Sequence, residues 1–394
     1  MFDDVPERAS ILGFLPSAGR GWVLITCQNP VWPPGQVLAV LVLDTQVAAE
    51  FLVGRTGDSD WASALELAKQ LGGLPLALEQ AAAYLQATGA CLADYLASFR
   101  GRRGALLARG EPVGYSGTVA TAWSLAFDRI DTEPQAVGLL RLLAFCAPEA
   151  VPLSLLLRPR PGLAEELGAS VVPALVPLLN DPLAANDAIA VLRRYSLITP
   201  AGNGSVSVHR LVQAVTADQM PADLAGQWRQ AAAALIEAAI PGDTGLPQTW
   251  PDCAALLPHA QAALAEHSGG MARLASYLGE RGRYGPALEL QRRVLDARER
   301  LLGVDHPDIL NTRHTLAQYT GEAGDPASAR NQFAALLPIR ERVLGAEHPD
   351  NLTTRHILAY FTGMAGDPVA ARDQLTKLPP PMYWTSRRKF RSTD

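Results

Sequence analysis

The sequence predicts a mostly α-helical protein with a short β-rich segment near its N-terminus and a solenoid of stacked helix pairs near its C-terminus. One observation behind this prediction is a motif set that recurs in the last third of the chain. Another is a β-rich apolar run near the start, after which the apolar residues follow helical spacing. Since the chain has 394 residues and domains hold roughly 100–200 residues, we expect two to four domains.

Composition and charge exclude several classes of protein. The chain has 34 basic and 39 acidic residues and a formal net charge of −5, which argues against a general nucleic-acid binder. Its four cysteines show no C-x-x-C spacing, so we expect neither a disulfide framework nor a zinc site, and we expect a cytoplasmic protein. With no run of eighteen apolar residues and no basic segment leading into an apolar run, neither a membrane span nor a signal peptide is expected.

The C-terminal repeat has a fixed period. The segment Leu-Gly-Val-Asp-His-Pro-Asp ends at Asp308, and Leu-Gly-Ala-Glu-His-Pro-Asp ends at Asp350, 42 positions later. Arg298-Glu299-Arg300 and Arg340-Glu341-Arg342 follow the same offset. Each unit has the pattern of two helices, and because one helix pair cannot bury its own apolar face, the units must stack. We interpret His-Pro-Asp as a turn and helix cap.

This pattern resembles the 42-residue form of the tetratricopeptide repeat, as in kinesin light chains, over residues 271–378. A helical linker is expected before it, at 223–270. Pro379-Pro380-Pro381 breaks any helix, so we expect a disordered tail at 379–394.

The N-terminal part begins with two expected strands, Trp22–Thr26 and Val37–Leu43, which are apolar and rich in β-branched residues. Residues 45–130 have helical spacing, interrupted by Gly72-Gly73 and restarted by a proline. Residues 131–222 hold three apolar helices, then Gly202-Asn203-Gly204 and an alternating Val-Ser-Val segment. Helices followed by such a hairpin suggest a winged helix.

The order of these features resembles NB-ARC domains and the actinobacterial STAND regulators. Leu24-Ile25-Thr26-Cys27-Gln28 is similar to the sensor strand of that family, Gly73-Leu74-Pro75-Leu76 to its GLPL motif, and Val208-His209-Arg210-Leu211 to its terminal His motif. The resemblance implies a C-terminal remnant of an α/β nucleotide-binding domain at 1–44, a helical subdomain at 45–130 and a winged-helix domain at 131–222.

The same resemblance assigns roles to single residues. It implies that Pro75 contacts the base of ADP or ATP and that His209 reaches the phosphates of ADP. Thr26 and Gln28 would lie on the sensor strand. Asp3 or Asp4 would be the carboxylate linked to Mg²⁺. The structural alternatives are a proline in ordinary helix-start geometry, a packed polar histidine and an acidic N-terminus.

Departures from the family pattern limit these roles. The chain contains no G-x-x-x-x-G-K-[ST] segment, whose backbone N–H groups and lysine hold phosphates. Gln28 replaces the sensor arginine. We therefore expect no enzymatic ATP hydrolysis, weak or no ADP binding, and Mg²⁺ only if a P-loop lies upstream. Met1 would then be internal to a longer protein, or the chain a fragment, with apolar strand edges exposed in both expected strands.

Two functions remain open. The first is a regulatory, signalling protein whose repeats bind a protein or peptide partner. The second is a DNA-binding transcriptional regulator that uses the winged helix, where Arg193 and Arg194 favour DNA and Asp181 and Asp187 oppose it. Of these two functions, we favour partner binding by the repeats over DNA binding.

Four repeat residues are candidates for partner contacts. Arg313 and His314 recur as Arg355 and His356 on the first helix of successive units, which we expect to line the concave groove. The alternative is that these side chains only stabilise the contact between repeats.

Overall fold

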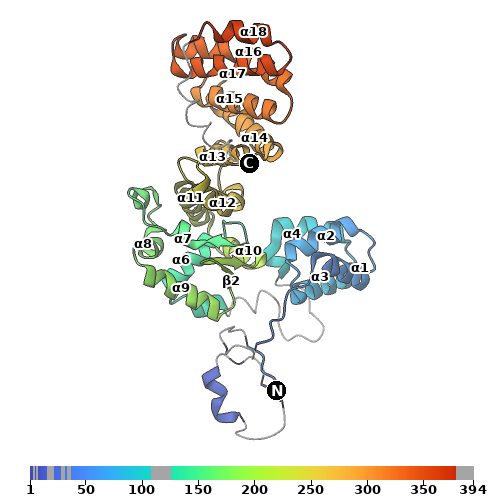
Figure 1. Cartoon of the computed structure of the whole chain (residues 1–394). Helices are drawn as coiled ribbons and strands as arrows, with labels where there is room; N and C mark the ends of the chain where they lie inside the picture. The colour runs from blue at the N-terminus through green and yellow to red at the C-terminus, as the bar shows by residue number, and fades with distance from the viewer. Residues whose placement is uncertain are drawn as a thin grey trace. The chain divides into compact units, whose positions relative to one another are not determined.

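The structure is a computed structural model of the chain. The residues whose placement it describes are 1–2, 5, 8–15, 22–27, 32, 37–107 and 126–378. The chain divides into two compact units, Met1–Ala239 and Ile240–Asp394 (Figure 1), and helices dominate both. The unit boundary falls within the segment expected as a linker. Asp3, Asp4, Gln28 and the expected disordered tail lie outside the described residues.

The N-terminal segment forms a parallel pairing between two short stretches of backbone. The Phe2 N–H donates to Leu24 O, and the Thr26 N–H donates to Phe2 O, each at 2.9 Å. The bridge between Phe2 and Ile25 is parallel. A short 3-10 helix, η1 (Arg8–Phe14), lies between the paired stretches in sequence. The strand expected at 22–26 is therefore present in reduced form, as one isolated bridge.

The second expected strand, Val37–Leu43, does not form, and that prediction is wrong. The physical reason is that no strand among the described residues pairs with this segment, and the Leu43 N–H donates to Gly73 O instead. Val40 is 92% exposed and Leu41 79%. Apolar side chains are therefore exposed in this segment, and Trp22 in the first segment is also fully exposed.

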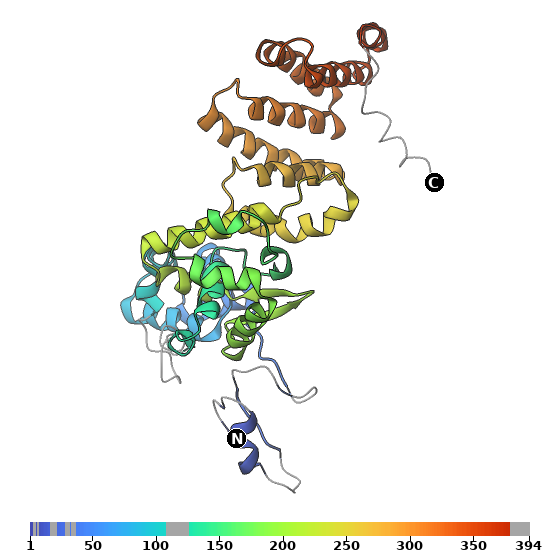
Figure 2. The same cartoon turned by 90° about the vertical axis from the view of Figure 1, so that its left-hand side faces the viewer.

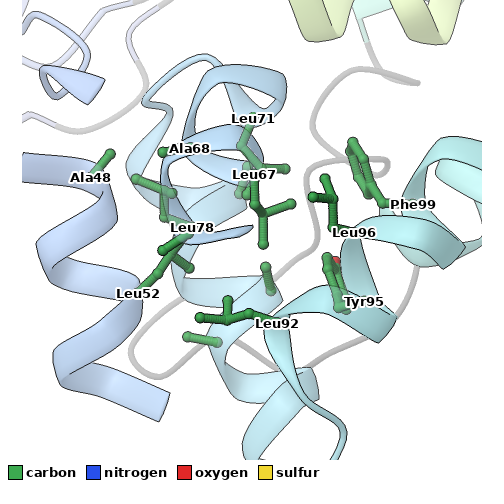
Figure 3. Packing of buried hydrophobic residues seen from close by; sticks show 14 of the residues in the cluster. Ala48, Leu52, Leu67, Ala68, Leu71, Leu78, Leu92, Tyr95, Leu96 and Phe99 are labelled. Atoms are coloured by element: carbon green, nitrogen blue, oxygen red, sulfur yellow. The ribbon is translucent and has the colours of Figure 1, made fainter. Parts of the chain in front are cut away.

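Four helices then build an apolar core (Figure 3). Asp44 caps the first helix by accepting from Gln46 N–H at 2.8 Å, and Asp60 caps the second by accepting from Ser63 N–H at 3.0 Å. Leucine and alanine side chains from all four helices fill the centre, and Tyr95 stacks on Phe99 at 6.0 Å between ring centroids. The helices are α1 (Thr45–Thr56), α2 (Trp61–Leu71), α3 (Pro75–Thr88) and α4 (Leu92–Leu107).

The next part of the first unit has the helix–hairpin order that the sequence predicts. Asn203 and Gly204 both take positive φ, 50° and 72°, which suits a tight hairpin between β2 and β3. The sheet order is β1-β3-β2, and both pairings are antiparallel. The elements are α6 (Pro134–Leu143), β1 (Val151–Pro152), α7 (Leu153–Leu156), η2 (Leu163–Glu166), α8 (Val172–Asn180), α9 (Pro182–Arg194), β2 (Ile198–Gly202), β3 (Ser205–Val208), α10 (Arg210–Asp218) and α11 (Ala222–Ala239).

The second unit is a stack of helix pairs, shown from a second side in Figure 2. Each helix from α13 to α18 packs against the next one in sequence. His306 and His348 accept from the N–H groups of Asp308 and Asp350, each at 3.2 Å, so their interpretation as caps is confirmed. The elements are η3 (Pro247–Thr249), α12 (Trp250–Ala263), α13 (Gly269–Glu280), α14 (Tyr284–Leu302), α15 (Pro307–Glu322), α16 (Pro326–Leu344), α17 (Pro349–Met364) and α18 (Pro368–Leu375).

Neighbouring pairs meet through an aromatic ring packed on a glycine. A Cβ built on Gly279 of α13 would overlap the ring of Tyr319 of α15, and one built on Gly321 of α15 would overlap the ring of Phe361 of α17. The two glycines are 42 residues apart, and so are the two aromatic residues. Because interiors pack as densely as crystals, such positions admit no added methyl group without displacement.

We expect Gly321→Ala to lower the stability of the repeat unit by roughly 1–3 kcal/mol, because the new methyl overpacks against Phe361. The matched control is Gly285→Ala in α14, where a Cβ would meet nothing within 4 Å and alanine favours the helix by up to ~1 kcal/mol. Thermal unfolding followed by circular dichroism should show a lower Tm for the first variant and an equal or higher Tm for the second. Equal shifts would refute the packing argument.

Candidate functional site

Three separate segments meet at the turn that ends α2. Gly72 and Gly73 have φ of 63° and 66°, in the left-handed region that favours glycine. A Cβ on Gly72 would collide with the ring of His209, and a Cβ on Gly73 would collide with the carbonyl of Leu43. Both glycines are therefore required by backbone conformation and by space. The turn holds together the segment before α1, the end of α2 and the start of α10.

His209 links this turn to α10 through both ring nitrogens. Its Nδ1 accepts from the Leu211 N–H at 3.3 Å, which caps the helix. Since Nδ1 is an acceptor, the network assigns the ring proton to Nε2, which donates to Gly72 O at 3.1 Å. Burial lowers the pKa of His209, the bond to Gly72 raises it, and the charge of Arg210 lowers it further. The net effect favours a neutral ring at pH 7.

Pro75 lies two residues beyond the same turn, at the first position of α3. It is exposed, and Leu74 before it makes no side-chain cap. The structure thus brings the start of the helix that holds Pro75 close to His209, although the two residues are 134 positions apart. Thr26 lies on the parallel bridge, where Val5 N–H donates to its carbonyl at 2.9 Å.

The repeat arginines chosen from the sequence form ion pairs within the array. Arg313 Nη2 lies 2.7 Å from Glu299 Oε1, and Arg355 Nη2 lies 2.7 Å from Glu341 Oε1. In both pairs the Nε–H also donates to the same carboxylate oxygen, at 3.2 Å and 3.0 Å. The pairs join the second helix of one unit to the first helix of the next.

The two repeat histidines also make contacts inside the array. Thr354 Oγ1 donates to Asp350 O, so His314 Nδ1–H must donate to Thr354 Oγ1, at 3.1 Å. The His314 ring meets Phe333 edge-on, with centroids 5.1 Å apart. His356 Nδ1–H donates to Leu352 O at 2.8 Å. These contacts fit the alternative that the four side chains stabilise the array itself. Binding of a partner by the four residues stays a prediction.

Two buried arginines were visible in the repeat motif, but the sequence did not give their role. Arg298 Nη1 donates to Thr312 Oγ1 at 2.9 Å. Arg340 donates to Leu310 O at 3.2 Å, and its Nη2 lies 3.3 Å from a carboxylate oxygen of Asp350. Burial lowers the pKa of Arg340, and Asp350 opposes this effect. Arg298 therefore satisfies a polar group of the following first helix, and Arg340 links the first helix of its own unit to that of the next, as a buried polar group requires.

Metal and membrane features are absent from the part of the chain that the structure describes. No group of three or more His, Cys, Asp or Glu side chains is placed to hold a metal ion within those residues. Among the described helices, no single one is long and apolar enough to cross a membrane. Only α8 and α9 pass that test as a pair, and they bend by 115°.

Comparison with known proteins assigns two segments of the chain. Residues 267–341 match the family profile described as tetratricopeptide repeat, and residues 126–224 match one described as domain of unknown function (DUF7779). No curated protein matches the chain. Two crystal structures of TPR-like repeats from a Podosopora anserina protein described as a putative kinesin light chain, one of them a point variant, share 18% identity at TM-score 0.29. They cover 50% of this chain and 85% or 86% of theirs. The C-terminal part of the chain consists of tetratricopeptide repeats.

We expect His209→Ala to destabilise the first unit by roughly 1–2 kcal/mol, because it removes a helix cap and the bond to Gly72 O. His209→Asn keeps a capping side chain and should lose only part of that amount. Urea denaturation followed by Trp fluorescence measures both. If alanine and asparagine cost the same, the cap does not contribute. If neither variant changes stability, the contact between His209 and the turn does not contribute to the free energy of unfolding.

We also expect the stability of the repeat unit to depend on His314. Burial and the charge of Arg340 lower the pKa of His314 to about 4, whereas an unfolded histidine has a pKa of about 6.5. The unfolded chain therefore binds the extra proton first, and stability falls as pH drops from about 6.5 to about 4. His314→Gln should remove about 1–2 kcal/mol of this loss between pH 7 and 5. The difference between the two denaturation curves measures it. Parallel pH profiles would contradict this assignment.

Proposed function

We propose that the chain is the partner-binding part of a STAND-type regulator. In this proposal the tetratricopeptide repeats bind a protein partner, and the helical and helix–hairpin parts of the first unit belong to the switch that controls it. The observation that carries the proposal is the stack of repeats at α13–α18, because such solenoids present extended surfaces for protein partners.

The exposed side of α15 gives the proposed binding surface a polar character. Thr315 and Gln318 are half-buried, one and two turns beyond Asn311, which is exposed and whose Oδ1 also accepts from Arg340 at 3.2 Å. These residues carry hydrogen-bonding groups and no net charge. A segment with polar side chains is therefore the expected partner at this helix. This surface does not include the four residues first predicted to bind a partner, which make contacts inside the array: Arg313, His314, Arg355 and His356.

The turn at Gly72 supports the switch part of the proposal. The resemblance assigns His209 to the phosphates of ADP, and here its Nε2–H donates to the carbonyl of Gly72. A phosphate oxygen can accept the same hydrogen, so phosphate and carbonyl would compete for one donor. The chain is not proposed to be an enzyme, and ADP or ATP is a proposed ligand only in a complete nucleotide-binding domain.

Direct DNA binding is the weaker alternative. The exposed residues of α9 include Arg194, but also Asp187 and the apolar Leu183. Phosphate contacts require an excess of positive side chains, and this helix does not provide one. The acidic balance of the whole chain points the same way.

Photocrosslinking tests the proposal directly. With benzoylphenylalanine at Gln318, on the first helix of a repeat, we expect a discrete crosslinked protein in extracts of the native host. The matched control places the same probe at Gln332, which is exposed on the second helix α16. A crosslink specific to position 318 supports the proposal. Equal products from both positions, or none from either, contradict it.

A further inference from the structure

The last helix pair of the array keeps the glycine on which, in the inner pairs, an aromatic ring of the next pair packs. In the inner contacts, Tyr319 packs on Gly279 and Phe361 packs on Gly321. Tyr319 also donates its hydroxyl hydrogen to Ser276 O at 3.2 Å, and Phe361 stacks on Phe333 with centroids 5.9 Å apart. Each contact therefore needs a glycine on one first helix and an aromatic ring on the next.

The third glycine of this series is Gly363 in α17, 42 positions after Gly321. A Cβ built there would meet Ala371 Cβ at 3.4 Å, and no closer atom among the described residues. Gly363 also lacks the positive φ that would explain a glycine by itself. In Figure 2, α17 and α18 form the last layer of the described array. We call the side of this layer that carries Gly363 the end face.

An apolar side chain of α18 is exposed where its inner equivalent is buried. Leu375 of α18 is 44% exposed, whereas Phe333, one period earlier, is fully buried and stacks on Phe361. The end face thus combines a glycine notch with an apolar rim at Leu375, the same chemistry that joins the inner pairs.

We propose that the end face binds one amphipathic helix of a partner protein, which places a Phe or Tyr ring on Gly363. The argument is continuity with the contact made twice inside the array, where a first helix supplies that ring. A second copy of the chain is a poorer occupant, because its Tyr319 and Phe361 are already buried on its own glycines. The end face is separate from the exposed side of α15, so this inference does not rest on the proposed function.

The test uses α17 itself as the probe, because it is the helix that covers the Gly321 notch. A fluorescent, helix-stapled peptide with the sequence of residues 345–366 is titrated with the full chain and followed by anisotropy. We expect saturable binding, weakened at least about tenfold when the peptide carries Phe361→Ala. Gly363→Leu in the protein should abolish binding, and the matched Gly285→Leu should leave it unchanged. Thermal unfolding confirms that both variants are folded.

Leu375→Glu gives a second variant at the rim, where an exposed side chain can change without touching the core; it should also weaken binding at least about tenfold. Failure of the peptide to bind, or equal binding to the wild-type chain and Gly363→Leu, overturns the proposal. Sedimentation equilibrium supplies the remaining outcome. If the chain is a dimer that Gly363→Leu converts to a monomer, a second copy occupies the end face and the partner helix is refuted.

Discussion

Close packing onto glycine is the constraint on which both units depend. In the first unit, Gly72 and Gly73 allow His209 and the Leu43 carbonyl to approach the end of α2. In the second unit, Gly279 and Gly321 allow an aromatic ring to lie against the backbone of the preceding first helix. The two uses differ in chemistry. The turn requires positive φ as well as space, whereas the helical glycines require space alone.

Local features of this fold were predictable because they depend on neighbouring residues. The period between Asp308 and Asp350 predicted the stacked pairs, and the His-Pro-Asp corners predicted caps at His306 and His348. Val37–Leu43 was not predictable in the same way, because a strand exists only when another strand pairs with it, and the sequence of one segment does not contain its partner. Its apolar composition fits a strand buried on both faces, but the segment is exposed here.

The candidate sites show the same division. Repetition identified Arg313 and His314 as a pair worth attention, but it could not separate a partner contact from a contact between repeats. The structure shows Arg313 on Glu299 and His314 on Thr354. The turn at Gly72 is a second case. The resemblance assigned Pro75 and His209 to one nucleotide, and the fold adds a contact that the sequence did not predict, with the His209 proton directed at the carbonyl of Gly72.

Both polar and apolar contacts join neighbouring repeats. The aromatic–glycine contacts bury apolar area, which stabilises the stack, and each ring fits only opposite a glycine. Arg298 adds a buried donor that needs an acceptor on the next helix, and Arg340 needs one acceptor on the preceding helix α15 and the Asp350 carboxylate on α17. A shifted register would leave these donors unsatisfied at a cost of several kcal/mol. The glycine notch recurs at Gly363, where a Cβ would meet only Ala371 among the described residues and no aromatic ring. The last described pair therefore keeps the glycine of the apolar contact, and an aromatic ring from a further helix can complete it.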